Sequence, residues 1–257
     1  MSDEPANSAP PRRRVRSFVR RAGRVTPAQR RALEEHWPRF GLDAAARDGA
    51  ANDAAAHDTG ARDTAAHDSL RPLDLDALFG RRAPRVLEIG FGNGETLLAL
   101  ASAHPERDFI GIEVHEPGVG HALLRAAELD LRNLRISRDD AVEVLERQVP
   151  DTSIAEALVF FPDPWPKSRH HKRRLIQPPF AALLARKLEP GGVLRAATDW
   201  ENYAEQILEV LSGCAALVNC AADGGCVPRP QSRPPTRFEL RGQRLGHDVR
   251  DFAFRRL

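Results

Sequence analysis

The sequence predicts an α/β fold, a doubly wound and mostly parallel sheet with an antiparallel strand pair at its C-terminal end. Short apolar runs alternate five times with longer amphipathic stretches between residues 85 and 212. Two later segments alternate apolar and polar residues with a period of two. Repeated strand-helix alternation is typical of parallel sheets with right-handed crossovers, and a period of two indicates strands.

The five strand-helix units follow one another along the chain. The expected strands are RVLEIG (85–90), DFIGIEV (108–114), NLRIS (133–137), ALVFF (157–161) and GVLRAAT (192–198). The helices expected after them are ETLLALASAH, VGHALLRAAELD, AVEVLERQV, PPFAALLARKL and WENYAEQILEVL. TRFEL and VRDFAFRR, on either side of RGQRLGHD, are expected to form the antiparallel pair at one edge of the sheet.

Length and composition indicate one sizeable core. The chain has 257 residues, of which 42% are hydrophobic and 29% charged, as in globular proteins. It lacks an apolar run of the ~18 residues that a membrane span needs, and MSDEPANSAPPRRR does not resemble a secretory signal. We therefore expect a cytoplasmic protein. Cys214, Cys220 and Cys226 lack the CxxC spacing of a metal site, so we interpret them as reduced thiols.

Basic residues are segregated although the net charge is only +2. Residues 12–31 contain nine arginines and no acid, 167–174 contain five Lys or Arg, and 229–256 contain eight arginines. Clustered cations are typical of proteins that bind a polyanion such as nucleic acid. The alternative is a solvated basic surface in a chain where 35 of the 38 basic residues are Arg.

Residues 43–69 interrupt the pattern with an Asp at every fifth position and no large apolar side chain. This period fits neither helix nor strand, so we predict a disordered, low-complexity insertion rather than a metal-binding tract formed by His57 and His67. The folded domain is then expected over 70–257, beginning near Leu70. Residues 1–42 would form a basic N-terminal arm, partly disordered, which orders on a nucleic acid or remains a solvated tail.

Carboxylates lie near the end of each of the five expected strands or just after it. In order they are Glu88, Glu113, Asp140, Asp163 and Asp199. Ligands of such sheets bind outside the carboxyl ends of the strands, where these side chains would meet. Asp140 and Asp199 also fit helix caps, and Asp140 to Glu143 has the spacing of a capping box. Glu88 and Glu113 lie inside strand patterns, where burying an unpaired charge is costly.

The segment GFGNG, with Gly90, Gly92 and Gly94, separates the first strand from its helix. Glycines let the backbone approach a ligand closely, and an acid at the tip of the second strand suits the ribose hydroxyls of an adenosine-containing cofactor. A dinucleotide carries a pyrophosphate and favours GxGxxG. S-adenosylmethionine carries an ammonium and a sulfonium, which Glu88 and Asp163 would attract, so the loop favours S-adenosylmethionine.

The stretch FFPDPWPKSRHHKRR (160–174) places Asp163 between prolines. Prolines exclude both a helix interior and a central strand, so this carboxylate must lie at the rim beyond the fourth strand. The basic residues that follow would reach a negatively charged partner.

Seven motifs together resemble the bacterial tRNA (guanine-N7-)-methyltransferase family, Rossmann-like enzymes that use S-adenosylmethionine. They are RVRSFVRRAGRVT, VLEIGFGNGETLL, FIGIEVHEPGVG, RDDAVEVL, FFPDPWPKSRHHKRR, ATDWENYAE and SRPPTRFELRGQRLGH. The match covers nearly the whole chain apart from the extreme N-terminus and the insertion. By this resemblance, tRNA is the partner and a variable-loop guanine becomes 7-methylguanosine. From the residues we expect no membrane and no metal partner, and the oligomeric state stays open between monomer and homodimer.

The resemblance also implies roles for single residues. Asp163 would be catalytic. Cofactor ligands would be Glu88, Glu113, Asp140 and Asp163, beside the glycines. Substrate contacts would be Lys167, Asp199, Thr236, Arg237, Phe238 and Glu239. RNA contacts would be Arg169, His170, His171, Lys172, Arg173 and Arg174.

Guanine-N7 carries a lone pair and no proton, so the transfer requires alignment rather than a general base. We therefore interpret Asp163 as a positioning and electrostatic group. Trp165 either stacks on the target base or packs under its loop. Two other functions remain open: an RNA-binding module with a vestigial cofactor pocket, and a nucleotide-dependent oxidoreductase.

Overall fold

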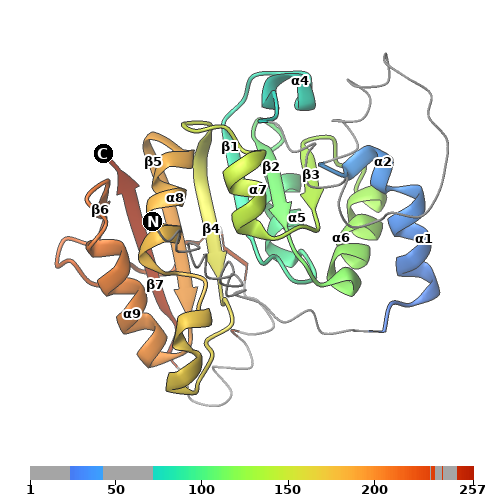
Figure 1. Ribbon diagram of the computed structural model, residues 1–257. Coiled ribbons are helices and arrows are strands. Elements are labelled where there is room, and N and C mark those ends of the chain that lie inside the picture. Colours follow the sequence, from blue (N-terminus) through green and yellow to red (C-terminus); the bar gives the residue numbers. More distant parts are fainter. Residues whose placement is uncertain (1–23, 43–71, 232, 235–238, 240–247) are drawn as a thin grey trace, which may run out of the picture.

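A central sheet organises the fold. The computed structural model describes residues 24–42, 72–231, 233–234, 239 and 248–257. Within these ranges, seven strands lie in the order β3-β2-β1-β4-β5-β7-β6. They are β1 (Arg85–Ile89), β2 (Asp108–Ile112), β3 (Leu134–Ser137), β4 (Ile154–Phe160), β5 (Leu188–Thr198), β6 (Leu217–Asn219) and β7 (Arg250–Arg256). β1 to β5 are parallel, and β7 is antiparallel to β5 and β6, which confirms the predicted fold class (Figure 1).

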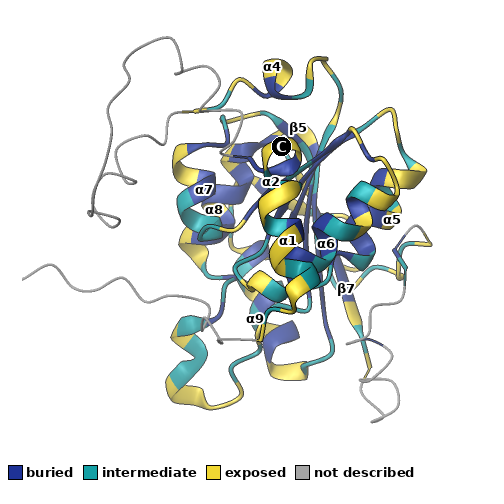
Figure 2. Cartoon of the chain, turned by 90° about the vertical axis from the view of Figure 1, so that its right-hand side faces the viewer, coloured by how far each residue is buried: buried dark blue, intermediate teal, exposed yellow. Residues whose placement is uncertain are grey.

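Helices cover both faces of the sheet because successive strand residues point to opposite sides (Figures 1 and 2). Val86, Leu158 and Phe160 face the core formed with α5 (Glu95–Ala103) and α6 (Glu116–Glu128). Leu87, Ile89 and Val159 belong to the core of the other face. The helices of that face are α7 (Ala141–Arg147), α8 (Pro178–Lys187) and α9 (Glu201–Ser212). The short α4 (Leu75–Phe79) precedes β1 and buries Leu75 and Leu78.

The folded part of the chain begins earlier than the expected start near Leu70. α1 (Pro27–Glu35) starts at a capping box in which Thr26 accepts from the backbone of Gln29 and Gln29 bonds back to Thr26. α2 (Trp37–Phe40) follows, and Phe40 and Leu42 are fully buried. The Leu42 backbone donates to Ile136 of β3 at 2.8 Å. Residues 24–42 are therefore packed into the domain, because their few apolar side chains cover α6 and β3.

The antiparallel pair also differs from the expectation in its members. β7 comes from the predicted VRDFAFRR segment, but its neighbours are β5 on one side and β6 on the other. Both edges of β7 are thus occupied, so TRFEL is not its partner. Residues 236–238 and 240 of TRFEL lie outside the described part of the chain. β6 was not predicted because three residues, LVN, give too short a period-two pattern.

Replacing Phe40 tests whether the first two helices belong to the core. Phe40→Ala should lower the free energy of unfolding by about 3–5 kcal/mol, because it removes a fully buried aromatic ring and leaves a cavity. Urea denaturation measures this value. The control is Glu35→Ala on the exposed side of α1, expected to change it by less than about 0.5 kcal/mol. Equal, small effects of both substitutions would show that this segment is not part of the cooperative unit.

Candidate active site

The candidate site lies at the carboxyl ends of β1 and β4. β1 pairs with β2 on one side and β4 on the other, so the strand order reverses between β1 and β4. α5 leaves β1 over one face, and α8 follows β4 on the opposite face (Figure 1). This divergence is a topological switch point, where open α/β sheets bind ligands.

The glycine loop between β1 and α5 is open toward this edge. Gly90 and Gly92 have φ values of 76° and 59°, which favour glycine. A Cβ at either position would have no atom within 4 Å, so the loop faces unfilled space. Its other side is packed tightly, because a Cβ on Gly118 of α6 would lie 2.2 Å from the Gly92 carbonyl oxygen. The loop therefore forms a backbone cradle whose position is set by α6.

Glu113, just beyond β2, fixes the same loop. Its Oε2 accepts from the Gly92 backbone at 2.8 Å, and its Oε1 accepts from the His115 backbone at 2.9 Å. A carboxylate has about four acceptor positions, so Glu113 retains capacity for two hydroxyl donors. This arrangement agrees with the expected contact to ribose hydroxyls.

Glu88 is the second carboxylate of the cradle, and it is buried. Its exposed fraction is 4%, and its Oε2 has no hydrogen-bond partner. Burial, and next the neighbouring Glu113, raise the pKa of Glu88 from 4.5 to about 8. A buried oxygen without a partner indicates a missing donor. The ammonium group of S-adenosylmethionine is a donor of the required charge, so the residues present fit this cofactor.

Asp140 and Asp199 follow β3 and β5, as expected. Asp140 caps α7, with its Oδ1 accepting from the Val142 backbone at 2.8 Å and from Glu143 at 3.4 Å. The capping interpretation is therefore confirmed for Asp140, whose position at the same edge also suits a cofactor ligand. Asp199 is half-buried between β5 and α9.

Asp163 lies on an exposed turn of unusual backbone geometry. Phe161 and Trp165, two residues to either side, have φ values of 50° and 45°. Positive φ is costly for bulky side chains and persists only where the surroundings enforce it. The turn begins where the Phe161 backbone donates to Ala197 of β5 at 2.8 Å. Asp163 is thus held at the end of β4, as the prolines predicted.

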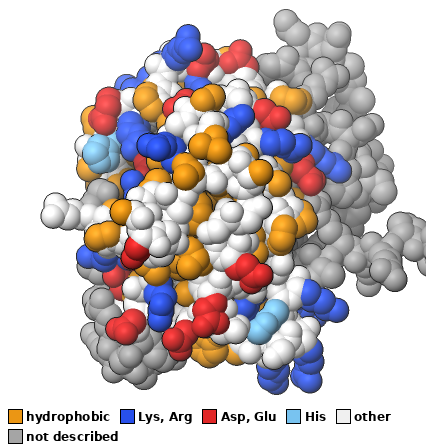
Figure 3. Space-filling view, turned by 90° about the vertical axis from the view of Figure 1, so that its left-hand side faces the viewer, with side chains coloured by type: hydrophobic (Ala, Val, Ile, Leu, Met, Phe, Trp, Pro, Cys, Tyr) orange, Lys and Arg blue, Asp and Glu red, His pale blue; other side chains and the backbone are white. Residues whose placement is uncertain are grey.

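The basic segment after Asp163 forms a 3₁₀-helix, η2 (Ser168–Arg173). Lys167, Arg169 and Lys172 are exposed. Figure 3 shows Lys and Arg side chains gathered beside a histidine at the lower right of one face of the molecule. His171 is half-buried, and its carbonyl accepts from Gln177 Nε2 at 2.9 Å.

The Trp165 ring packs against two side chains of η2. The Arg173 guanidinium lies 5.1 Å from the centre of its ring, and His170 meets the ring edge-on with centroids 5.8 Å apart. Partial burial, and next the cations Arg173 and Arg169, lower the pKa of His170. These contacts support the packing interpretation of Trp165.

Two residues expected to contact substrate or RNA are buried instead. Arg174 is 2% exposed and bonds to protein oxygens, so it is not available to a phosphate. Glu239 is 1% exposed and accepts from Arg233 Nη1 at 2.7 Å, so it acts as an interior ion-pair partner rather than an exposed ligand. Thr236, Arg237 and Phe238 lie outside the described residues.

The partner of Glu239 was missed by the sequence analysis. Arg233 is 2% exposed, pairs also with Asp251 at 3.0 Å, and lies 5.3 Å from the centre of the Phe160 ring. Burial raises the pKa of Asp251, and Arg233 opposes this shift. This ionic cluster supports the end of β4 from the α5 face. Arg233 is one of many arginines near the end of the chain, and no local pattern distinguishes it.

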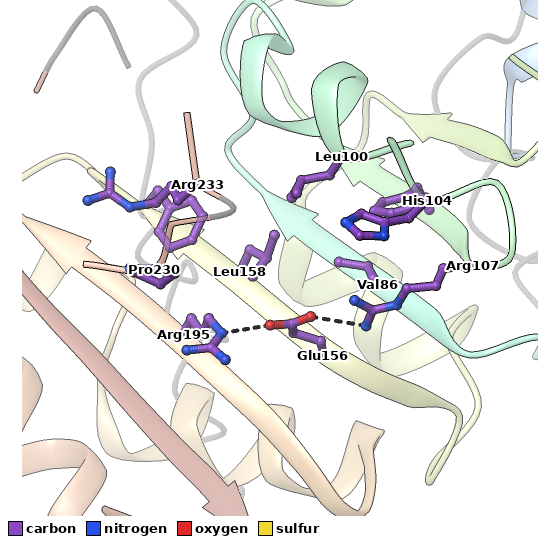
Figure 4. Close-up of a pocket in the computed structure, with 11 residues that line it drawn as sticks. Val86, Leu100, His104, Arg107, Glu156, Leu158, Arg195, Pro230 and Arg233 are labelled. Carbon is purple, nitrogen blue, oxygen red and sulfur yellow. Dashed lines mark hydrogen bonds and ion pairs between the residues drawn. The ribbon is translucent and has the colours of Figure 1, made fainter. Parts of the chain in front are cut away.

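A cavity of about 40 Å³ lies on the α5 face of the sheet (Figure 4). Glu156 is held there between Arg107 at 3.0 Å and Arg195 at 2.6 Å. The cavity is small, and the charges of Glu156, Arg107 and Arg195 already satisfy one another. It is therefore not the candidate ligand site.

Among the helices of the described ranges, none is both long and apolar enough to cross a membrane. In the same part of the chain, His, Cys, Asp and Glu side chains do not gather in a group of three that could hold a metal ion.

The pKa of Glu88 predicts how stability depends on pH. The folded state favours the protonated carboxyl, so this contribution is fully present below about pH 4.5 and is lost as the pH rises through about 8. Glu88→Gln keeps the shape without the titration. Urea denaturation between pH 6 and 8.5 should show wild-type stability falling relative to the variant as the pH rises. Parallel curves would contradict an elevated pKa.

Comparisons with known proteins agree with this geometry. Residues 82–252 match a family described as "Putative methyltransferase". The tRNA (guanine-N(7)-)-methyltransferase of Methylococcus capsulatus is 53% identical, over the whole of both chains. That of Leifsonia xyli is also 53% identical, over 95% of this chain and 96% of the relative. The crystal structure of the 16S rRNA methyltransferase KamB covers 72% of this chain and 94% of its own, with 17% identity and a TM-score of 0.53, and shares the fold. The chain therefore belongs to the tRNA (guanine-N7-)-methyltransferase family.

Proposed function

We propose that this protein transfers the methyl group of S-adenosylmethionine to N7 of a guanine in the tRNA variable loop, producing 7-methylguanosine. The proposal rests on the relatives of about half identity over the full chain. The observation that carries it is the buried, unpartnered Glu88 oxygen beside an open glycine loop, which fits a cationic methyl donor. An RNA-binding module with a vestigial pocket is not supported, because these elements are intact.

The cofactor would be held by residues of the first three strand ends. Glu88 would accept a hydrogen bond from the amino group, and Glu113 would accept from the ribose hydroxyls while still holding Gly92. Gly90 and Gly92 would leave room for close approach along the backbone, whereas Gly94, at the start of α5, packs against Ala122 and Leu98. Asp140 would add a contact from the start of α7. When bound, S-adenosylmethionine supplies an electrophilic methyl group on a sulfonium.

Asp163 would align and stabilise the guanine. In the transfer the N7–CH₃ bond forms as the S–CH₃ bond breaks, and the positive charge moves from sulfur to the guanine ring. No proton is transferred. A carboxylate held beside the ring both accepts from guanine donors and stabilises the charge that develops on it. Lys167 and Asp199 would contact the substrate, as the family resemblance implies.

The exposed cations of η2 would bind the RNA backbone. Lys167, Arg169 and Lys172 are exposed, and Trp165 holds Arg173 and His170 at the same surface. Cations at fixed positions bind phosphates and release counterions. Because tRNA is the substrate, we place the enzyme in the cytoplasm. We expect it to be a monomer or a homodimer.

Removing the charge of Asp163 should abolish efficient transfer. For Asp163→Asn we expect kcat for tRNA methylation to fall on the order of 10²–10³-fold, because an aligned charge is lost from the transition state. Transfer of radiolabelled methyl groups to tRNA measures the rate, and calorimetry with S-adenosylhomocysteine checks the cofactor site. The control is Glu128→Gln on exposed α6. An Asp163→Asn enzyme of wild-type kcat would refute the assigned role.

Neutralising one η2 arginine should weaken RNA binding without slowing chemistry. Arg173→Ala should raise the KM for tRNA and reduce the slope of log affinity against log salt by about one. Arg132→Ala serves as the control, because Arg132 is exposed beyond the opposite end of β3. The phosphate contact fails as an explanation if both variants keep the wild-type salt slope.

A further inference from the structure

Arg174 differs from the rest of the basic segment that it ends. Lys172 is exposed and Arg173 is half-exposed, whereas Arg174 is only 2% exposed. Its guanidinium lies 4.7 Å from the centre of the Tyr203 ring in α9. One residue of a run that looks uniformly suited to phosphate binding is therefore part of the protein interior.

The Arg174 side chain connects the turn around Asp163 to α9. Its Nε donates to the Pro164 carbonyl at 2.8 Å, one residue after Asp163. Its Nη1 donates to Gln206 Oε1 at 2.8 Å and to the Asn202 carbonyl at 3.3 Å. Its Nη2 donates to Asn202 Oδ1 at 2.8 Å. The planar guanidinium thus joins the turn around Asp163 to two consecutive turns of α9.

Neighbouring contacts keep the α9 side of this connection rigid. Gln206 Nε2 donates to the Ile176 carbonyl at 3.0 Å. The Ile176 backbone donates to the buried Tyr203 hydroxyl at 3.1 Å. The part of α9 that Arg174 contacts is therefore itself held by two hydrogen bonds to the Ile176 backbone.

The turn around Asp163 needs a hydrogen-bond donor from outside its own segment. Pro162, Pro164 and Pro166 have no backbone N–H, so the segment around Asp163 has few donors with which to hold itself. Phe161 and Trp165 have positive φ values, which relax unless the surroundings oppose them. Pro164, which accepts the hydrogen bond from Arg174, lies between Asp163 and the strained Trp165.

The burial of Arg174 is costly, which indicates a specific role. Burial lowers the pKa of its guanidinium, although arginine remains charged in proteins. The four acceptors are neutral carbonyl and amide oxygens, so the hydrogen bonds compensate desolvation without neutralising the charge. A lysine at this position would keep the charge but lack the fork that reaches several acceptors at once.

We propose that Arg174 is a positioning residue for Asp163, holding the Pro-Asp-Pro turn against α9, and that it does not contact RNA. The inference rests on the proposed function, since it assigns Arg174 to the same reaction. A shift of about 1 Å in a group that aligns reactants can lower the rate on the order of 10²-fold, so the effect should appear in kcat.

Charge-preserving substitutions separate the two roles. Arg174→Lys should lower kcat for tRNA methylation by ~10–100-fold, with the KM for tRNA and the salt slope unchanged. Arg132→Lys, the matched control, should keep wild-type kcat, KM and salt slope, because Arg132 is exposed beyond the opposite end of β3. Arg174→Ala should resemble Arg174→Lys. An Arg174→Lys enzyme with wild-type kcat, or one whose main defect is a raised KM with a reduced salt slope, would overturn the proposal.

Two variants on α9 test the connection without changing any cation. Asn202→Ala and Gln206→Ala each remove a side-chain acceptor of Arg174, and together they should lower kcat with KM for tRNA unchanged. Added to Arg174→Lys, Asn202→Ala should have little further effect, since both disrupt one connection. If Arg174→Lys does not fold, the α9 double variant decides: unchanged kcat overturns the proposal. An inactive wild-type protein would instead refute the proposed function.

Discussion

The reversal of strand order between β1 and β4 is the constraint on which the site depends. Parallel strands bring their carboxyl ends to one edge, and crossovers to opposite faces keep that edge uncovered. β1, which holds Glu88 and leads into the glycine loop, and β4, which leads into the Asp163 turn, are neighbours that end at this edge, although more than 70 residues separate Glu88 from Asp163. A sheet without this reversal would place a helix across the same edge and close the space that a cofactor needs.

The site combines features that each reduce stability. Glu88 is a buried carboxyl with an unpartnered oxygen, and the turn around Asp163 contains two bulky residues at positive φ. Interior arginines hold this arrangement from both sides of the sheet. Arg174 fixes the turn to α9, and Arg233 supports the end of β4 from the α5 face through its bonds to buried acids. Arg169 remains exposed, as the proposed RNA contact requires.

Much of the fold was predictable because it depends on local pattern. The five parallel strands and their helices follow from periodicity, and the acids at strand ends follow from chain order. Burial was not predictable for single arginines. Arg173 and Arg174 are identical neighbours in the sequence, and only the acceptors that the fold places around Arg174, on Pro164, Asn202 and Gln206, make it interior. The early start of the fold was missed because α1 is mostly polar, although its capping residue Thr26 is a recognisable signal.

We propose that the methyl donor binds at the β1–β4 edge, between the glycine loop and the Asp163 turn. A crystal structure with bound S-adenosylhomocysteine tests it most directly. We expect the amino group within hydrogen-bond distance of Glu88, the ribose against Glu113, and the sulfur directed toward the Asp163 turn. Binding anywhere else, for example at the cavity around Glu156, or a sulfur directed away from Asp163, would contradict the account.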